Sequence, residues 1–301
     1  MGLVGTKRWT SVSLKVLRTQ VNGGMERSDD KVWANMLNLT HEYHGQAVNW
    51  YAVVRGDTGL AAAVYQWIDG HQIEPLYLMT VLETLQDESP LVIALKYGGG
   101  DPLTDRLPPE QTLYFSAPAQ VSLAEVLHQL RTRMVVYFEG NTTGLLHYYH
   151  PQVASYFFTL AAAEETSGWL GLCCSAMVYR QQLSEPPGWV EVGDGHSEAD
   201  PDVWVMQPGQ AQALARLSED KTIAAWAQQS DIREIDWLCQ HQVTRFCDNH
   251  NIQAAPLQNQ LRLWAQQNQF YLDTFQPEEQ FLALQPEQKI AQLEQRVARG
   301  L

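Results

Sequence analysis

Two cysteines and two histidines in the last quarter of the chain are of types that could hold a metal ion: Cys239, His241, Cys247 and His250. Thiolate and imidazole groups are the usual ligands of zinc in proteins. All four fall on one predicted helix, where Cys239 and Cys247 are eight residues, or about 12 Å, apart. Ligands of one ion lie about 2 Å from it, so these two cysteines cannot share it. Cys247 and His250 would need further ligands from elsewhere, and we therefore expect core cysteines, a surface histidine and no metal site.

Loops that could cradle a phosphate or a cation lack the spacing that this chemistry needs. The run Gly98 to Asp101 has neither a Lys-Ser/Thr ending nor the Gly-x-Gly-x-x-Gly spacing, which favours a flexible turn. The acidic residues between 194 and 202 do not follow the calcium-loop pattern, which favours a solvated loop. The chain also has no Gly-x-Ser-x-Gly or His-Glu-x-x-His motif. We expect no catalytic residues and no cofactor.

Composition narrows the class of partner. The 301 residues carry a formal net charge of −14, from 20 basic and 34 acidic residues, which argues against nucleic acid as a partner. Four cysteines are too few for a disulfide scaffold and fit the reducing cytoplasm. No apolar run approaches the ~20 residues of a membrane span, so we expect no membrane insertion.

Between residues 46 and 207, short apolar runs alternate with helical patterns, which predicts a mixed sheet flanked by helices. Ser122 and Glu125 form a capping box for a helix that ends near residue 133. Residues 1–45 are polar and irregular and read as a peripheral extension. The other elements that we expect in this lobe are strands at 50–54, 75–78, 91–95, 112–115, 134–138 and 203–206, helices at 58–69, 80–86 and 151–163, a strand from Gly168 towards Tyr179, and a loop-rich stretch over 183–202.

From residue 208 to residue 301 the pattern is helical throughout. We expect two runs at 211–217 and 218–227, and a third helix with a capping box from Asp231 to Glu234 that continues to about residue 249. Further helices are expected from Pro256 and around residues 290–297. The predicted fold is therefore α+β, with an N-terminal α/β lobe and a C-terminal all-α lobe.

A corner joins an aromatic run at residues 145–149 to a helix that starts at Pro151. Proline cannot continue a central strand but suits the first turn of a helix. On a strand, Tyr148 and Tyr149 would point to opposite faces, as would His147 and His150. We therefore expect a partly exposed rim, with Tyr148, Tyr149 and His150 as partner-binding residues beside the cleft between the lobes. Core packing is the alternative for each aromatic ring.

An ordered set of segments resembles the type VI secretion effector chaperones, also called adaptors (Tap or TEC proteins). At the corner the family commonly reads Arg-Tyr-Tyr-Asp-Pro-Arg-Val, and this chain has His147-Tyr148-Tyr149-His150-Pro151-Gln152-Val153. The resemblance spans about residues 49–298 and is carried also by segments 50–56, 74–77, 89–95, 122–135, 247–252, 261–270 and 289–297.

The corner also departs from the family, because His147, His150 and Gln152 replace Arg, Asp and Arg. Charged side chains there would make charge-assisted hydrogen bonds, so we expect these bonds to be weaker or differently arranged in this chain. The departure puts in doubt any partner contact that the family makes through those charges. It favours a diverged member with its own cognate effector.

The resemblance implies a binding protein rather than an enzyme. Such a chaperone holds a toxic effector in the bacterial cytoplasm and helps to place it on the VgrG spike. Two alternatives stay open: an enzyme of unassigned class that uses the loops 97–101 and 194–202, and a small-ligand-binding or purely structural module.

Overall fold

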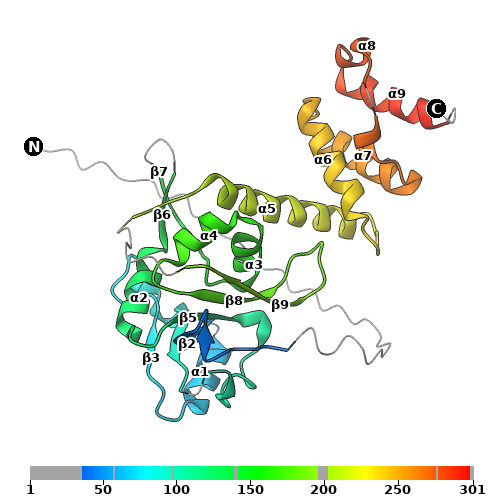
Figure 1. Cartoon of the computed structure of the whole chain (residues 1–301). Helices are drawn as coiled ribbons and strands as arrows, with labels where there is room; N and C mark the ends of the chain where they lie inside the picture. Colours follow the sequence, from blue (N-terminus) through cyan, green and yellow to red (C-terminus); the bar gives the residue numbers. More distant parts are fainter. Residues whose placement is uncertain are drawn as a thin grey trace, which may run out of the picture. The chain divides into compact units, whose positions relative to one another are not determined.

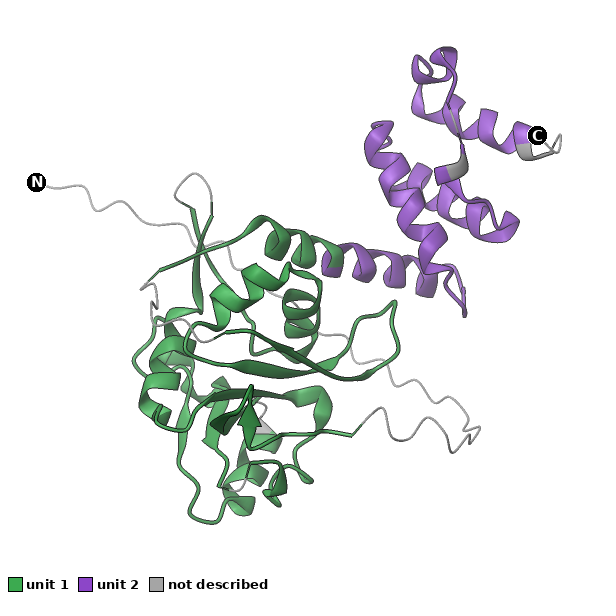
Figure 2. Ribbon diagram, viewed as in Figure 1, with its two compact units in different colours: residues 1–216 green, residues 217–301 purple. Residues whose placement is uncertain are grey.

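The computed structural model describes residues 36–56, 58–96, 98–138, 142–195, 203–275 and 277–298 (Figure 1). Contacts divide the chain into two compact units, residues 1–216 and 217–301 (Figure 2). The division falls inside the helix α5 (Pro208–Gln229). Across the described residues, no helix is both long enough and apolar enough to cross a membrane. The fold class predicted from the sequence is confirmed, with a sheet in the N-terminal half and helices in the C-terminal part.

Strands of the first unit form two sheets. They are β1 (Glu42–Tyr43), β2 (Gln46–Val54), β3 (Ile73–Pro75), β4 (Leu91–Ala94), β5 (Thr112–Pro118), β6 (Val135–Phe138), β7 (Thr142–Leu145), β8 (Ser175–Arg180), β9 (Gly188–Gly193) and β10 (Trp204–Val205). The larger sheet has the order β3-β4-β2-β5-β8-β9, with β1 beside β2, and its described pairs are all antiparallel. The smaller sheet, β10-β6-β7, contains the parallel pair β10–β6 and so carries the mixed pairing that the sequence predicted.

The helices differ in length between the two units. The first unit has α1 (Thr58–Trp67), α2 (Leu123–Thr132), α3 (Pro151–Leu160), α4 (Ala163–Leu170) and the short 3₁₀ turns η2 (Glu83–Glu88), η3 (Gly98–Gly100) and η4 (Pro109–Gln111). The second unit continues from α5 through α6 (Trp237–Asn249), α7 (Ala255–Asn268), η5 (Leu272–Thr274), α8 (Glu279–Leu282) and α9 (Pro286–Ala298).

The central strand β2 is buried on both faces along its second half, residues 50–54. Trp50, Ala52 and Val54 pack on one face with Leu60 and Val64 of α1. A strand covered on both sides needs a continuous apolar run rather than alternation. That is why the run at 50–54 could be recognised in the sequence.

The opposite face of the large sheet carries an aromatic cluster. Phe115 of β5 lies opposite Tyr51 of β2, so both side chains point to this face. The ring of Phe115 lies 6.1 Å from that of Trp169 on α4 and 6.4 Å from that of Tyr148 at the corner. The corner, α3 and α4 therefore cover this face of the sheet.

The predicted capping box of α2 is confirmed. The Ser122 hydroxyl accepts from the Glu125 N–H at 3.3 Å, and Glu125 Oε2 accepts from the Ser122 N–H at 2.8 Å. Farther along α2, Arg131 donates to the carbonyl oxygens of Pro75 and Leu76 at 3.0 and 3.2 Å. The helix is therefore bonded to the end of β3 as well as packed on the sheet.

Two expectations about residues 168–193 were wrong. Residues 168–170 end the helix α4 instead of opening a strand, and Gly171 closes that helix with a φ of 54°. Gly168 suggested a break, but a Cβ there would lie 3.3 Å from the Trp204 ring, so the small residue serves close packing. The stretch 183–202 was expected to be loop, yet β9 forms within it and pairs with β8 at the sheet edge.

Two helix boundaries also differ from the expectation. The runs 211–217 and 218–227 form one continuous helix, α5, with no break at Ser218, which the sequence suggested as a cap. The third helix starts five residues later than expected, because Asp236, and not Asp231, caps it by accepting from the Cys239 N–H at 3.0 Å. Asp231 lies in the left-handed region with φ 54°, which a helical residue cannot adopt.

Several expectations fall outside the described residues. They concern residues 1–35 of the N-terminal extension and the acidic residues Glu198, Asp200 and Asp202. They also include Gly140-Asn141, which the sequence suggests as a hairpin turn, and Gly300, which it suggests as the end of the last helix.

The glycine run that was expected to be a flexible turn is instead held in place by close packing and hydrogen bonds. A Cβ at Gly99 would lie 2.5 Å from the Leu39 carbonyl oxygen, so only glycine fits there. Asp101 is 1% exposed and accepts from the N–H groups of Lys96 and Leu103 at 2.8 and 3.0 Å and pairs with His71 Nε2 at 2.9 Å. Burial raises the pKa of Asp101, but these hydrogen bonds outweigh it and leave the pKa below its ordinary value.

We expect Asp101→Asn to lower the free energy of unfolding by about 1–3 kcal/mol, because a buried charged acceptor is lost from its donors. The folded pKa is lowered, so this stabilisation is present above the ordinary pKa of about 3.9 and disappears as the pH falls through the lower folded value. Urea unfolding at several pH values measures it. Asp105→Asn, at an exposed position of the same segment, is the control. An equal loss in the control, or a difference that persists at low pH, would contradict the assignment.

Candidate functional site

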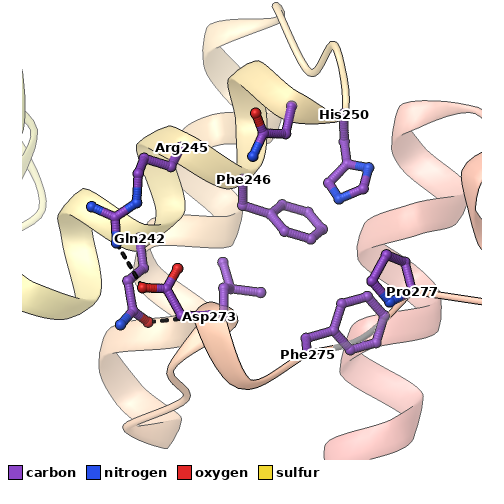
Figure 3. A pocket seen from close by; sticks show the side chains of 9 residues that line it. Gln242, Arg245, Phe246, His250, Asp273, Phe275 and Pro277 are labelled. Atoms are coloured by element: carbon purple, nitrogen blue, oxygen red, sulfur yellow. Dashed lines mark hydrogen bonds and ion pairs between the residues drawn. The ribbon is translucent and has the colours of Figure 1, made fainter.

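A pocket of about 350 Å³ opens in the second unit between α6 and the segment around η5 (Figure 3). The α6 side contributes residues spaced three or four apart, which places them on one helix face. The pocket is lined by Gln242, Arg245, Phe246, Asn249, His250, Leu272, Asp273, Phe275 and Pro277.

The inner wall of the pocket is aromatic. Phe246 is 6% exposed and belongs to the core of the second unit. Its ring lies 4.2 Å from the His250 ring and 6.2 Å from the Phe275 ring. The His250 ring also meets the Phe281 ring edge-on at 5.5 Å. The inner wall of the pocket is thus part of the aromatic cluster that stabilises the second unit.

The mouth of the pocket is polar but its charges are balanced. Arg245 Nη2 and Asp273 Oδ2 form an ion pair at 2.7 Å, with both side chains 53% exposed. Gln242 Oε1 accepts from the Asp273 N–H at 3.3 Å, which holds η5 against α6. Asn249 is exposed at the end of α6.

His250 adds no charge at neutral pH. Burial lowers the pKa of His250, and the nearby positive charge of Lys289 lowers it further. Arg245, Asp273 and His250 are the ionisable residues in the lining, so the pocket as a whole is neutral. Such a site can stack on a flat apolar group and can hydrogen-bond at its rim.

The four residues with metal-binding side chains are dispersed. Cys239 and Cys247 are buried core residues, as predicted, and burial raises the pKa of each thiol to about 11. His241 is 4% exposed and pairs with Asp220 Oδ1 at 2.7 Å. His250 alone of the four lines the pocket. In the part of the chain that the structure describes, no three His, Cys, Asp or Glu side chains converge on a common point.

The two tyrosines at the 147–151 corner are core residues, which corrects the prediction that they form a recognition rim. Tyr148 is 0% and Tyr149 6% exposed. The expectation of opposite faces required a strand, but β7 ends at Leu145 and residues 148–149 form a turn. In a turn both rings can point inward. The Tyr148 ring lies 4.7 Å from Trp169, and its hydroxyl donates to the Leu130 carbonyl oxygen at 2.7 Å.

Neutral hydrogen bonds hold the corner in place of the family's charges. The Tyr77 hydroxyl donates to the Tyr149 hydroxyl at 2.7 Å, and the Tyr149 hydroxyl lies 2.5 Å from His147 Nδ1. Burial lowers the pKa of His147, so its neutral imidazole can accept this bond at Nδ1. His150 is partly exposed at the N-cap of α3, directly before Pro151.

The pocket was missed by the sequence analysis. The run of Gln242, Phe246 and His250 at helical spacing was a usable signal for one wall. The opposite wall is formed by Leu272, Asp273, Phe275 and Pro277, whose spacing has no periodicity that would assign them to α6.

These features define an α+β protein with a sheet-containing unit and a helical unit that carries a neutral aromatic pocket. A family model described as "Domain of unknown function (DUF4123)" matches residues 50–167. The match begins in β2, includes α2 and the corner, and ends within α4, so the pocket residues lie outside it. Comparisons with curated proteins and with solved structures found no match.

We expect Tyr148→Phe to lower the free energy of unfolding by about 1–2 kcal/mol, because the buried Leu130 carbonyl loses its donor. Partner affinity should not change, since the ring stays in place and the hydroxyl is inaccessible. Urea unfolding and a binding titration measure the two quantities. Tyr65→Phe, at a residue that is 52% exposed, should leave stability within about 0.5 kcal/mol. A loss of affinity at unchanged stability would restore Tyr148 as a recognition residue.

His250 should titrate below its ordinary pKa of about 6.5 when its ring is followed by NMR. The unfolded chain binds the proton more readily, so the stability of the second unit is complete above about pH 6.5 and falls as the pH drops towards the lower folded pKa. His250→Gln should weaken this dependence in thermal unfolding from about pH 5 to about pH 8. His128→Gln, at an exposed position of α2, should not; an unchanged profile in the His250 variant would refute the assignment.

Proposed function

We propose that this chain is a non-enzymatic chaperone or adaptor that binds a cognate type VI secretion effector in the bacterial cytoplasm and helps to load it onto the VgrG spike. The observation that carries the proposal is the DUF4123 match over residues 50–167, because that family is associated with type VI secretion effector chaperones. The same range contains the corner and the segments 50–56, 74–77, 89–95 and 122–135 of the sequence resemblance, whereas its segments after residue 246 lie outside the match.

A loading protein must cover apolar surface of its client and later release it, which calls for accessible apolar contacts of moderate strength. The second unit offers the aromatic pocket described above. The first unit exposes Met79, Val81 and Leu85, at 81%, 58% and 47%, within seven residues. These contacts support a binding role.

The structure supports the two alternative functions, an enzyme and a small-ligand-binding module, to different degrees. The enzyme hypothesis relied on the loops 97–101 and 194–202. In the first loop the Asp101 carboxylate already accepts from the N–H groups of Lys96 and Leu103. Residues 196–202 of the second loop lie outside the described residues. The small-ligand reading gains from the pocket, which is a cavity of suitable chemistry. It predicts that the pocket is filled by a free metabolite when no effector is present.

Co-expression with the effector encoded beside this gene should yield a stable complex that survives size-exclusion chromatography. An effector from a different secretion cluster, expressed in the same way, is the control and should elute alone. Deleting the gene should abolish delivery of the cognate effector while the spike itself is still secreted. An effector that stays soluble, loaded and active in the deletion strain would disprove the proposal, whereas a small molecule that co-purifies with the effector-free chain would favour the ligand-binding alternative.

A further inference from the structure

We propose that the pocket between α6 and η5 is an anchor site for one uncharged aromatic side chain, presented by a peptide segment of the client protein. The identity of the client as an effector rests on the proposed function. The chemistry of the site rests on the pocket itself.

The size of the pocket selects a side chain over a larger ligand. Pockets for complete small molecules span roughly 300–1,000 Å³, and this one, at about 350 Å³, lies at the small end. One tryptophan or tyrosine side chain with its flanking backbone fits.

The walls select an aromatic group. Phe246, Phe275 and His250 present ring faces and edges to the cavity (Figure 3). These rings already meet one another at tilted and edge-on angles. A further ring can continue the same packing, since aromatic pairs prefer offset and edge-to-face geometry.

The charges select a neutral group. Arg245 and Asp273 are paired with each other at 2.7 Å, so neither offers a counter-charge to a ligand. A charged side chain would lose hydration on entering a cavity whose own charges are already paired, which is unfavourable. Asn249 at the rim has an amide that can both donate to and accept from the backbone of a bound segment.

The first test blocks the mouth of the pocket. Asn249 lines the pocket, whereas the neighbouring Asp248 is also exposed on α6 but does not line it. Asn249→Trp should weaken binding of the co-expressed effector about tenfold or more, as expected for a hot-spot contact. Asp248→Trp should change it less than about twofold. Circular dichroism of both variants establishes that they fold.

The second test needs no effector. N-acetyl-tryptophanamide, N-acetyl-leucinamide and N-acetyl-lysinamide are titrated into the full chain while the His250 ring protons are followed by NMR. The tryptophan probe should give a saturable shift that Asn249→Trp removes, the leucine probe a weaker one, and the lysine probe none. Equal shifts from the lysine probe, or none from the tryptophan probe, would overturn the proposal.

The two tests separate this inference from the proposed function. If the wild-type chain binds the tryptophan probe but no effector, the proposed function fails and the chemistry of the pocket is supported. If it binds effector and both tryptophan variants bind equally well, the anchor site fails and the chaperone role stands. A change in oligomeric state with Asn249→Trp at unchanged effector affinity would show that a second copy of the chain fills the pocket, which also overturns the proposal.

Discussion

The packing of the first unit depends on the hydrogen bonds made by the carbonyl groups at the C-terminal end of α4. The last carbonyl groups of a helix have no partner within it, and burying one unpaired costs about 1–3 kcal/mol. Here Gln129 of α2 donates to the Leu170 carbonyl, and Arg133 Nε donates to the Trp169 carbonyl at 3.0 Å. Both side chains are 0% exposed. Because α4 can enter the core only beside these donors, α2 fixes the place of Trp169, whose ring contacts Phe115, Tyr148, Phe157 and Phe158.

The corner is held by hydrogen bonds between uncharged groups. Tyr148 bonds to α2, and Tyr149 joins Tyr77 to His147. In the Tyr149–His147 contact the neutral imidazole can act as the acceptor, so the corner is hydrogen-bonded without the charged side chains that are common in the resembling family. His147 and His150 are partly exposed at the corner, whereas both tyrosines are buried. The Tyr-Tyr pair therefore stabilises the core of the first unit, and under the proposed function the specificity for a partner comes from other residues.

The sequence predicted the elements whose signals are local. The buried run of β2 and the Ser122–Glu125 capping box can be read from adjacent residues. Sequence patterns gave the wrong local structure where contacts outside the pattern determine it. Gly168 suggests a break unless Trp204 is known to pack on it, and Tyr148 and Tyr149 can both point inward because β7 stops at Leu145. The pocket needs η5 to lie against α6, a contact between segments that no short pattern connects.

The energetics of one aromatic anchor bear on how a client could be both held and released. Burying an aromatic side chain removes about 150–250 Å² from water, or roughly 4–6 kcal/mol at about 25 cal/mol per Å². A dissociation constant near 1 mM already corresponds to about 4 kcal/mol, and ordering the segment reduces the gain further. One anchor alone therefore gives weak and rapidly reversible binding. Stable retention needs at least one more contact on the same client, since linked sites multiply their affinities. Under the proposed function, loss of either contact would then release the client while this chain stays folded.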